Sequence, residues 1–261
     1  MSRALIFVCG ILLSAPLWAA DEIKDIPTRS GVTQRLLLIK AERPVAVLVM
    51  FAGGDRALGI RKDGSLQWGG ASLLLRTSPL FVQRGFTVAI VDMPSDRLTE
   101  AIGNFRESTE HAQDIAAVID FLRRDSGLQI WLMGTSSGTT SVLNAAIHLQ
   151  KHGADGIVLT TGIAADSGSP LTTQLDEIRV PTLLVRKGDP CHPAQSGDAT
   201  GIIAALKNAP KAEELTVQSI VDKGADPCNI PPVHGYLGME NQLADKISGW
   251  IKTMLRRQNF I

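Results

Sequence analysis

Short apolar runs alternate along the chain with longer segments whose apolar residues recur every three or four positions. The short runs predict β-strands at Val32–Ile39, Val45–Phe51, Phe86–Val91, Gln129–Met133, Gly156–Thr161, Thr182–Val185 and Leu215–Val221. Helical spacing appears in two long segments, with apolar positions Ile115, Val118, Ile119 and Leu122, and then Leu243, Ile247, Trp250, Ile251 and Met254. Shorter crossover helices are expected at Ser141–Leu149 and Gly201–Leu206. The alternation predicts an α/β class with a mainly parallel, twisted sheet flanked by helices on both faces.

The N-terminus has the pattern of a secretory signal peptide. Arg3 precedes the apolar run Ala4–Leu13, and Pro16 breaks that run before the small residues Ala19 and Ala20. We expect residues 1–20 to be a signal peptide cleaved after Ala19 or Ala20, and residues 21–261 to form a single exported domain, periplasmic or secreted. Retention as a membrane anchor is the alternative, but the uncharged run is short for a membrane span.

Charge excludes some functions. The chain carries 26 basic and 26 acidic residues, so nothing favours a nucleic-acid partner or stable insertion in a membrane after cleavage. The histidines and cysteines lack the spacing of metal ligands, so no metal and no cofactor are expected.

A candidate nucleophile lies at Ser136, in the sequence Gly134-Thr135-Ser136-Ser137-Gly138. This G-x-S-x-G pattern follows a predicted strand and precedes a helical run from Thr139, which is the strand–turn–helix setting that the motif requires. Glycines are needed because side chains two residues on either side of the serine would collide with neighbouring backbone. The alternative is an ordinary βα turn rich in glycine and serine.

The candidate base is His234. It lies in the irregular segment Pro231–Tyr236 just before the last helix, from which an imidazole can reach a serine hydroxyl. His192 is a competitor beside Asp189, but it precedes the final strand. The remaining histidines lie on or near helices and are expected to be solvated surface residues: His111, His148 and His152.

Asp189, which follows the strand at Thr182–Val185, is the favoured acid. A carboxylate there can hold the imidazole in the required tautomer and stabilise the imidazolium. Asp166 is the alternative acid, and Asp226 lies close to the histidine segment, where it could instead be a turn residue.

Cys191 and Cys228 are the cysteines that remain after signal removal, and a pair in an exported chain suggests a disulfide. Such a bridge would stabilise the fold by about 4 kcal/mol in the chain-entropy model and would join the segments of the candidate acid and base. Two free thiols are the alternative.

Taken in order, Phe51–Gly54, Gly134–Gly138, Gly188-Asp189 and His234-Gly235-Tyr236 resemble the α/β-hydrolase superfamily, over about residues 32–255. The segment Val91–Arg97 also resembles a sparsely characterised group of exported bacterial hydrolases. The resemblance implies the α/β-hydrolase fold and the chain order Ser136, Asp189, His234 for a catalytic triad. It also implies an oxyanion hole from the backbone N–H of Ser137 and of Gly53 or Gly54. The connection at 162–179 is too short for a lid domain.

The expected function is that of a serine carboxylesterase acting on short- or medium-chain acyl esters, with a small-molecule ester as its partner. The alternatives are a peptidase or amidase of the same fold and a non-catalytic exported binding protein. The segment Arg56–Trp68 is the longest irregular stretch and either shapes the pocket or forms a surface loop.

Overall fold

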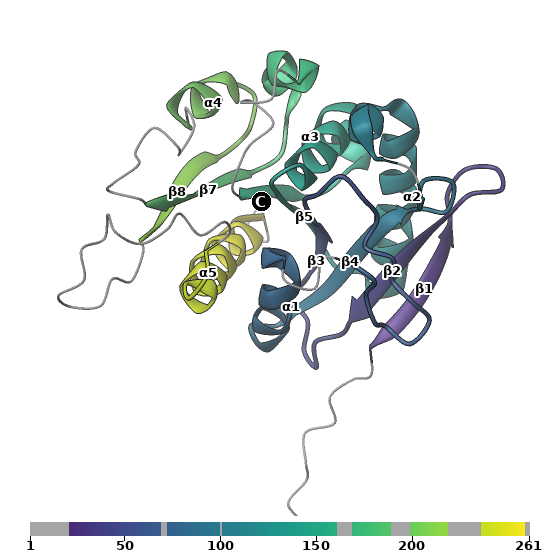
Figure 1. The fold of residues 1–261 in the computed structure, drawn as a ribbon. Coiled ribbons are helices and arrows are strands. Elements are labelled where there is room, and N and C mark those ends of the chain that lie inside the picture. The colour runs from purple at the N-terminus through teal and green to yellow at the C-terminus, as the bar shows by residue number, and fades with distance from the viewer. Residues whose placement is uncertain are drawn as a thin grey trace, which may run out of the picture.

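The computed structural model describes residues 21–68, 72–99, 101–160, 169–188, 199–218 and 236–258. Within them, eight strands form one twisted sheet in the order β1-β2-β4-β3-β5-β6-β7-β8, with helices on both faces (Figure 1). The expected α/β class with a mainly parallel sheet is confirmed. The signal-peptide prediction at 1–20 lies outside the described residues.

The strands differ in direction only at the N-terminal edge of the sheet. β1 pairs antiparallel with β2 and β2 antiparallel with β4, whereas every pairing from β4 to β8 is parallel. The bounds are β1 Glu22–Pro27, β2 Thr33–Ile39, β3 Ala46–Phe51, β4 Phe86–Pro94, β5 Ile130–Thr135, β6 Gly156–Thr160, β7 Thr182–Gly188 and β8 Ala212–Gln218. The carboxyl ends of β3 and β5 therefore lie side by side at one edge, where the candidate site is expected.

Two helix layers bury the two faces of the sheet. The helices are α1 Leu73–Gln83, α2 Thr109–Ser126, α3 Gly138–Leu149, α4 Ala199–Ala205 and α5 Glu240–Gln258, with short 3₁₀ helices η1 Gly103–Glu107, η2 Gln150–His152 and η4 Pro170–Glu177. The ribbon shows α2 and α3 on one face and α1 and α5 on the other (Figure 1). Alternate residues of β3 face the two layers: Val47 and Val49 pack with α2 and α3, while Leu48 and Met50 pack with α1 and α5. This period of two is what a strand buried on both faces requires.

All seven predicted strands are present, with shifted boundaries. The structure adds β1, whose edge position leaves most of its residues partly exposed, so it carries little apolar signal. It also adds α1, which contains Pro79 and so runs against the usual reading of proline as a helix breaker. Of the connection between β6 and β7, the described part is 169–181, which holds η4; the absence of a lid domain stays a prediction.

The irregular segment 56–68 is organised by a buried carboxylate. Asp92, at 2% exposure, accepts the backbone N–H groups of Leu58 and Ile60, both at 2.7 Å. Leu58 and Ile60 are themselves buried, and Ile60 forms an isolated bridge with Leu66. This part of the segment is therefore built into the fold by the strand β4 that carries Asp92.

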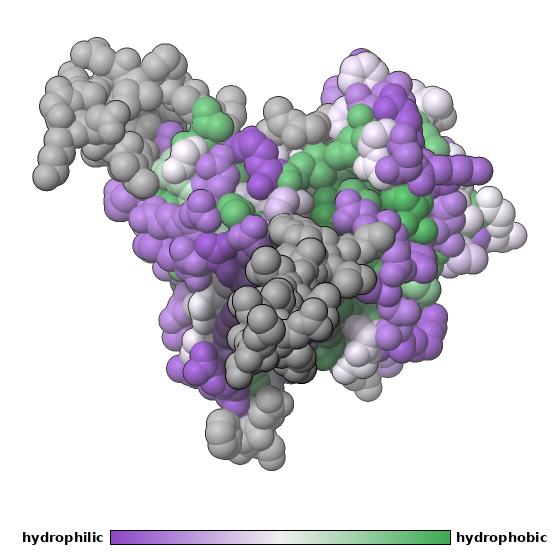
Figure 2. Space-filling view, turned by 90° about the horizontal axis from the view of Figure 1, so that it is seen from below, coloured by the Kyte–Doolittle hydropathy of each residue, from purple (hydrophilic) through white to green (hydrophobic). Residues whose placement is uncertain are grey.

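Hydrophilic and hydrophobic residues are mixed on the described surface seen from below (Figure 2). The large apolar side chains that are exposed there or elsewhere in the described ranges are Val45, Trp68, Leu98 and Leu237. Within those ranges, no helix combines the length and apolar character needed to cross a membrane.

Candidate active site

Ser136 occupies a strained turn between β5 and α3. Its φ is +51°, in the left-handed region that a residue with a side chain enters only at a cost of about 1–3 kcal/mol. The turn is held on both sides: the N–H of Ser136 donates to Thr160 O on β6 at 3.2 Å, and its carbonyl accepts the N–H of Thr139 at 2.9 Å. The Ser136 side chain is exposed at the carboxyl edge of the sheet.

The two glycines of the motif are demanded by close backbone contacts. A Cβ at Gly134 would lie 2.5 Å from the carbonyl oxygen of Gly138, and a Cβ at Gly138 would lie 2.0 Å from the carbonyl oxygen of Phe51. Real Cβ atoms do not approach backbone oxygens this closely. The crowding expected from the sequence is therefore present at both positions, and it brings the start of α3 against the end of β3.

The loop after β3 faces the serine. A Cβ at Gly53 would lie 2.8 Å from Ser136 Cβ and 3.4 Å from Ser136 Oγ, so a side chain at position 53 would occupy the space beside the hydroxyl. Gly54 has φ +112°, a conformation that favours glycine.

Gly54 and Ser137 are joined by a reciprocal pair of hydrogen bonds. Gly54 N–H donates to Ser137 Oγ at 2.9 Å, and Ser137 Oγ–H donates to Gly54 O, also at 2.9 Å. The N–H of Gly54 is thus engaged, while the N–H of Gly53 has no acceptor among the described residues. Of the two glycines that the sequence left open, Gly53 is the one whose N–H remains available to a ligand.

The structure brings together Ser136, Ser137, Gly53 and Gly54. Asp189, His234, Cys191 and Cys228 lie outside the described residues, as do the alternatives Asp166, His192 and Asp226. Their described neighbours in the chain are Gly188, which ends β7, and Tyr236, whose hydroxyl donates to Val185 O on β7 at 2.9 Å. The segment that follows His234 is therefore fastened to the strand that precedes Asp189.

Sequence reasoning missed a buried arginine behind the glycine loop. Arg106, in η1, is 4% exposed. Its Nη2 donates to Ala52 O at 3.0 Å and lies 3.5 Å from Gly54 O, and its Nη1 donates to Ser141 Oγ at 2.8 Å. Burial lowers the pKa of Arg106 to about 10, so the guanidinium remains charged at neutral pH.

The prediction that His111 is a solvated surface residue is wrong. His111 is fully buried, with Nε2 2.9 Å from Ser141 Oγ, whereas His148 and His152 are exposed as expected. Burial, and then the positive charges of Arg106 and Arg29, lower the pKa of His111 to about 3. The imidazole is therefore neutral at neutral pH and is enclosed within the fold rather than open to a substrate.

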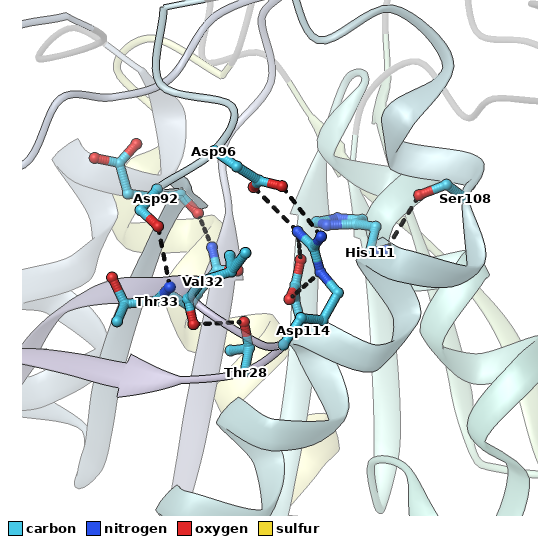
Figure 3. A network of polar contacts seen from close by, with 11 residues as sticks. Thr28, Val32, Thr33, Asp92, Asp96, Ser108, His111 and Asp114 are labelled. Atoms are coloured by element: carbon cyan, nitrogen blue, oxygen red, sulfur yellow. Dashed lines mark hydrogen bonds and ion pairs between the residues drawn. The ribbon is translucent and has the colours of Figure 1, made fainter.

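A second arginine, Arg29 in the turn between β1 and β2, binds α2 and the segment after β4 (Figure 3). Arg29 forms paired hydrogen bonds with Asp96, at 3.1 and 3.0 Å, and with Asp114, at 2.9 and 3.0 Å. Asp114 has no exposed surface, whereas Arg29 keeps 19% of its side chain exposed. Two acidic partners thus surround this guanidinium.

A small cavity lies beside the glycine loop, at the carboxyl ends of β3 and β4. It has room for about one water molecule and is lined by Phe51, Ala52, Gly53, Arg56, Leu58, Val91, Met93 and Arg106. Among the described residues, no group of three or more histidine, cysteine, aspartate or glutamate side chains could hold a metal ion.

Comparison with known proteins identifies the architecture. No protein-family model and no curated protein matches the sequence. Among solved structures, an esterase of Pyrococcus furiosus is 13% identical with a TM-score of 0.62, over 94% of this chain and 95% of that one. A dienelactone hydrolase of Anabaena variabilis is 16% identical with a TM-score of 0.60, over 90% of this chain and 97% of that one.

Esterase 2 of Thermogutta terrifontis, solved phosphonylated by cyclosarin, is 16% identical with a TM-score of 0.54, over 90% of this chain and 96% of that one. These matches cover nearly the whole length of each chain. At such identities the likeness establishes the fold. The chain has the α/β-hydrolase fold.

Proposed function

We propose that this protein is a serine hydrolase, specifically a carboxylesterase acting on short- or medium-chain acyl esters. The observation that carries the proposal is Ser136: an exposed residue on a strained strand–turn–helix junction, beside Gly53, whose N–H has no acceptor among the described residues. A strained non-glycine residue at the carboxyl edge of an α/β sheet is the kind of conformation that functional sites retain.

In this proposal Ser136 Oγ attacks the acyl carbonyl while His234 takes the hydroxyl proton. Asp189 orients the imidazole and stabilises its charged form. The N–H groups of Ser137 and Gly53 hold the oxyanion, and the engagement of Gly54 N–H by Ser137 Oγ supports Gly53 as the second donor. His234 then protonates the leaving alcohol, and water releases the acyl group by the same route.

The test is hydrolysis of p-nitrophenyl esters of increasing acyl length by the purified mature protein, beside Ser136→Ala. Turnover that disappears in the variant would support the serine mechanism, and the preferred acyl length would measure the pocket. Labelling by a fluorophosphonate should require Ser136; the esterase of Thermogutta terrifontis, which shares the fold, was solved phosphonylated.

Two outcomes separate the rival functions, and one variant serves as a control. Cleavage of p-nitroanilides at rates above those of the matched esters would favour an amidase or peptidase. A folded wild-type protein that neither turns over esters nor takes the fluorophosphonate label would contradict the hydrolase proposal and favour a binding protein. Replacing Ser137 by alanine should leave labelling in place, because Ser137 contributes through its backbone.

We also propose that the protein is exported and carries a Cys191–Cys228 disulfide. N-terminal sequencing of protein recovered from the periplasm or medium should begin at Ala20 or Asp21. Mass spectrometry after alkylation, with and without reduction, should show the two thiols protected only before reduction. Full-length protein in the membrane fraction, or two freely alkylated thiols, would contradict these assignments.

A further inference from the structure

The peptide unit between Ala52 and Gly53 is contacted from behind by a cation. Its carbonyl oxygen accepts a hydrogen bond from Arg106 Nη2 at 3.0 Å. Its N–H, on Gly53, has no acceptor among the described residues, and Gly53 faces Ser136. The carbonyl oxygen of this peptide thus contacts a guanidinium, while its nitrogen belongs to Gly53, the residue beside the candidate nucleophile.

The geometry of the peptide bond links these two ends. A trans peptide is planar, with its C=O and N–H pointing in opposite directions, so a contact that holds the oxygen also sets the direction of the N–H. A hydrogen bond from a charged donor is roughly twice as strong as a neutral one, and it polarises the group that accepts it. The guanidinium therefore both aims the Gly53 N–H and makes it a stronger donor.

Arg106 is itself fixed from the helix that begins at the serine turn. Ser141, on α3, accepts a hydrogen bond from Arg106 Nη1 at 2.8 Å, and Asn144 Nδ2, also on α3, donates to Arg106 O at 3.0 Å. The glycine loop holds the same 3₁₀ segment through Ile102 N–H, which donates to Asp55 O at 2.9 Å. The guanidinium is thus anchored to both parts of the candidate site.

The charge on Arg106 is unusual because no acidic side chain pairs with it in the described part of the chain. Removing a charge from water costs several kcal/mol unless an opposite charge compensates it. Among the described residues, the hydrogen-bond partners of the guanidinium are a hydroxyl and backbone carbonyls. An anion forming at the Gly53 N–H would face a positive charge across a single peptide unit.

We propose that Arg106 is a positioning residue for the oxyanion hole, which orients and polarises the Ala52–Gly53 peptide so that the Gly53 N–H stabilises the oxyanion. The inference rests on the proposed hydrolase function. It assigns Arg106 a role in the transition state rather than in substrate binding, since the guanidinium lies behind the peptide.

Kinetics provide the first test. Arg106→Met should lower kcat on the best p-nitrophenyl ester by about tenfold to a hundredfold, less than the roughly 10²–10³ lost when an oxyanion donor is removed outright. KM should hardly change, because the interaction strengthens only as charge develops. Arg106→Lys should recover part of kcat, since an ammonium restores a point charge but not the guanidinium fork.

Arg123→Met is the matched control. Arg123 also donates to a backbone carbonyl, that of Gly153 at 2.8 Å, but it lies near the start of β5, at the opposite end of the strand from Ser136. This variant should keep the wild-type kcat. An Arg106→Met protein that is folded by circular dichroism and retains the wild-type kcat, or loses activity only through KM, would overturn the proposal.

A spectroscopic test does not depend on activity. Ala52–Gly53 is the one Ala–Gly dipeptide in the sequence, so protein labelled with ¹³C-carbonyl alanine and ¹⁵N-glycine gives a single inter-residue NMR correlation from this peptide. In Arg106→Met the Ala52 carbonyl carbon should move upfield, as it does when a hydrogen bond to a carbonyl is lost, while Arg123→Met should leave it in place. An unmoved correlation in Arg106→Met would overturn the polarisation step. A moved correlation in a protein that takes no fluorophosphonate label would instead contradict the hydrolase function alone.

Discussion

Two arginines close to α2 carry their charge in different ways. Arg29 lies between the carboxylates of Asp96 and Asp114 (Figure 3), whereas Arg106 donates to a hydroxyl and to backbone carbonyls of the glycine loop. The hydrogen bond with Asp114 raises the pKa of Arg29, while burial lowers the pKa of Arg106. One guanidinium joins structural elements through two carboxylates, while the other has no acidic partner in the part of the chain that the structure describes.

The contrast between Arg29 and Arg106 distinguishes a contact that stabilises the fold from one proposed to act in catalysis. Asp96 and Asp114 more than compensate the charge of Arg29, and their contacts join the β1–β2 turn to the segment after β4 and to α2. Arg106 has no acidic partner in the described ranges, and its contact with Ala52 O places its charge one peptide unit from the Gly53 N–H. His111 lies between the two cases, since both arginines lower its pKa, with Arg106 contributing more than Arg29. The pKa of His111 is therefore sensitive to both arginines, and its change in each variant compares their effects.

The largest loss of stability is expected from Arg29→Met. It would leave Asp114, which has no exposed surface, as a buried carboxylate with its main partner removed. Breaking a buried pair on one side costs about 3–5 kcal/mol, and the partial exposure of Arg29 places the expected loss at the lower end, about 3 kcal/mol. Urea unfolding at pH 7 would measure it, and kcat of the folded fraction should stay at the wild-type value. A urea midpoint equal to that of the wild type would show that the contacts of Arg29 do not stabilise the fold.

Acidification should destabilise the protein through His111. Its pKa is about 3 in the folded state and about 6.5 when unfolded, so below pH 6.5 the unfolded chain binds the extra proton. Stability from this group is complete above pH 6.5 and is lost as the pH falls, by about 2 kcal/mol between pH 6.5 and 5.

His111→Gln should remove that part of the pH dependence, as measured by urea unfolding at several pH values. The acid sensitivity should also shrink in Arg106→Met, and by more than in Arg29→Met, because Arg106 is the larger electrostatic cause. Equal pH slopes in wild type and His111→Gln would contradict the buried, neutral histidine.

Arg106→Met should cost less stability than Arg29→Met, about 1 kcal/mol. Replacing a buried ion by an apolar side chain of similar volume is often close to neutral, and the loss comes from the carbonyl and hydroxyl groups that no longer have a donor. Unfolding in urea beside the kinetic assay would show a large effect on kcat with a small effect on stability. A stability loss greater than that of Arg29→Met would contradict the expectation that Arg29 contributes more to stability than Arg106.

The smallest effect is expected at the start of α2, the helix shared by both regions. Ser108 Oγ accepts the N–H of His111 at 3.1 Å and caps the helix (Figure 3). Ser108→Ala should lower the free energy of unfolding by about 1 kcal/mol or less without changing kcat, while Ser108→Asn, which keeps a capping oxygen, should cost less still. Thermal melting can resolve the difference; equal losses in both variants would argue against a capping role.

Sequence patterns predicted the elements that are buried on both faces. β3 and β5 are buried throughout, so their apolar runs are clear, and the glycines around Ser136 mark the turn by a steric need that is local in the chain. The edge strand β1 was missed because three of its six residues are charged, and α1 because Pro79 lies inside it.

The polar interior was harder to predict. His111 could have been placed, since it lies four residues before Ile115 on the same buried stripe of α2. Arg106 carries no such signal: its contact with Ala52 joins positions 54 residues apart, and an arginine in a polar stretch normally faces solvent. The Asp92 contacts with the 58–60 backbone are likewise long-range and follow only from the packed sheet.

The positive φ of Ser136 has a consequence for protein engineering. Glycine would adopt this backbone conformation without the penalty that a serine incurs, so replacing the candidate nucleophile would relieve strain. Catalysis and stability therefore place opposite demands on residue 136. Directed evolution that selects for heat resistance alone would favour glycine at this position and so yield inactive variants. Selection that also requires turnover must obtain stabilising substitutions at other positions.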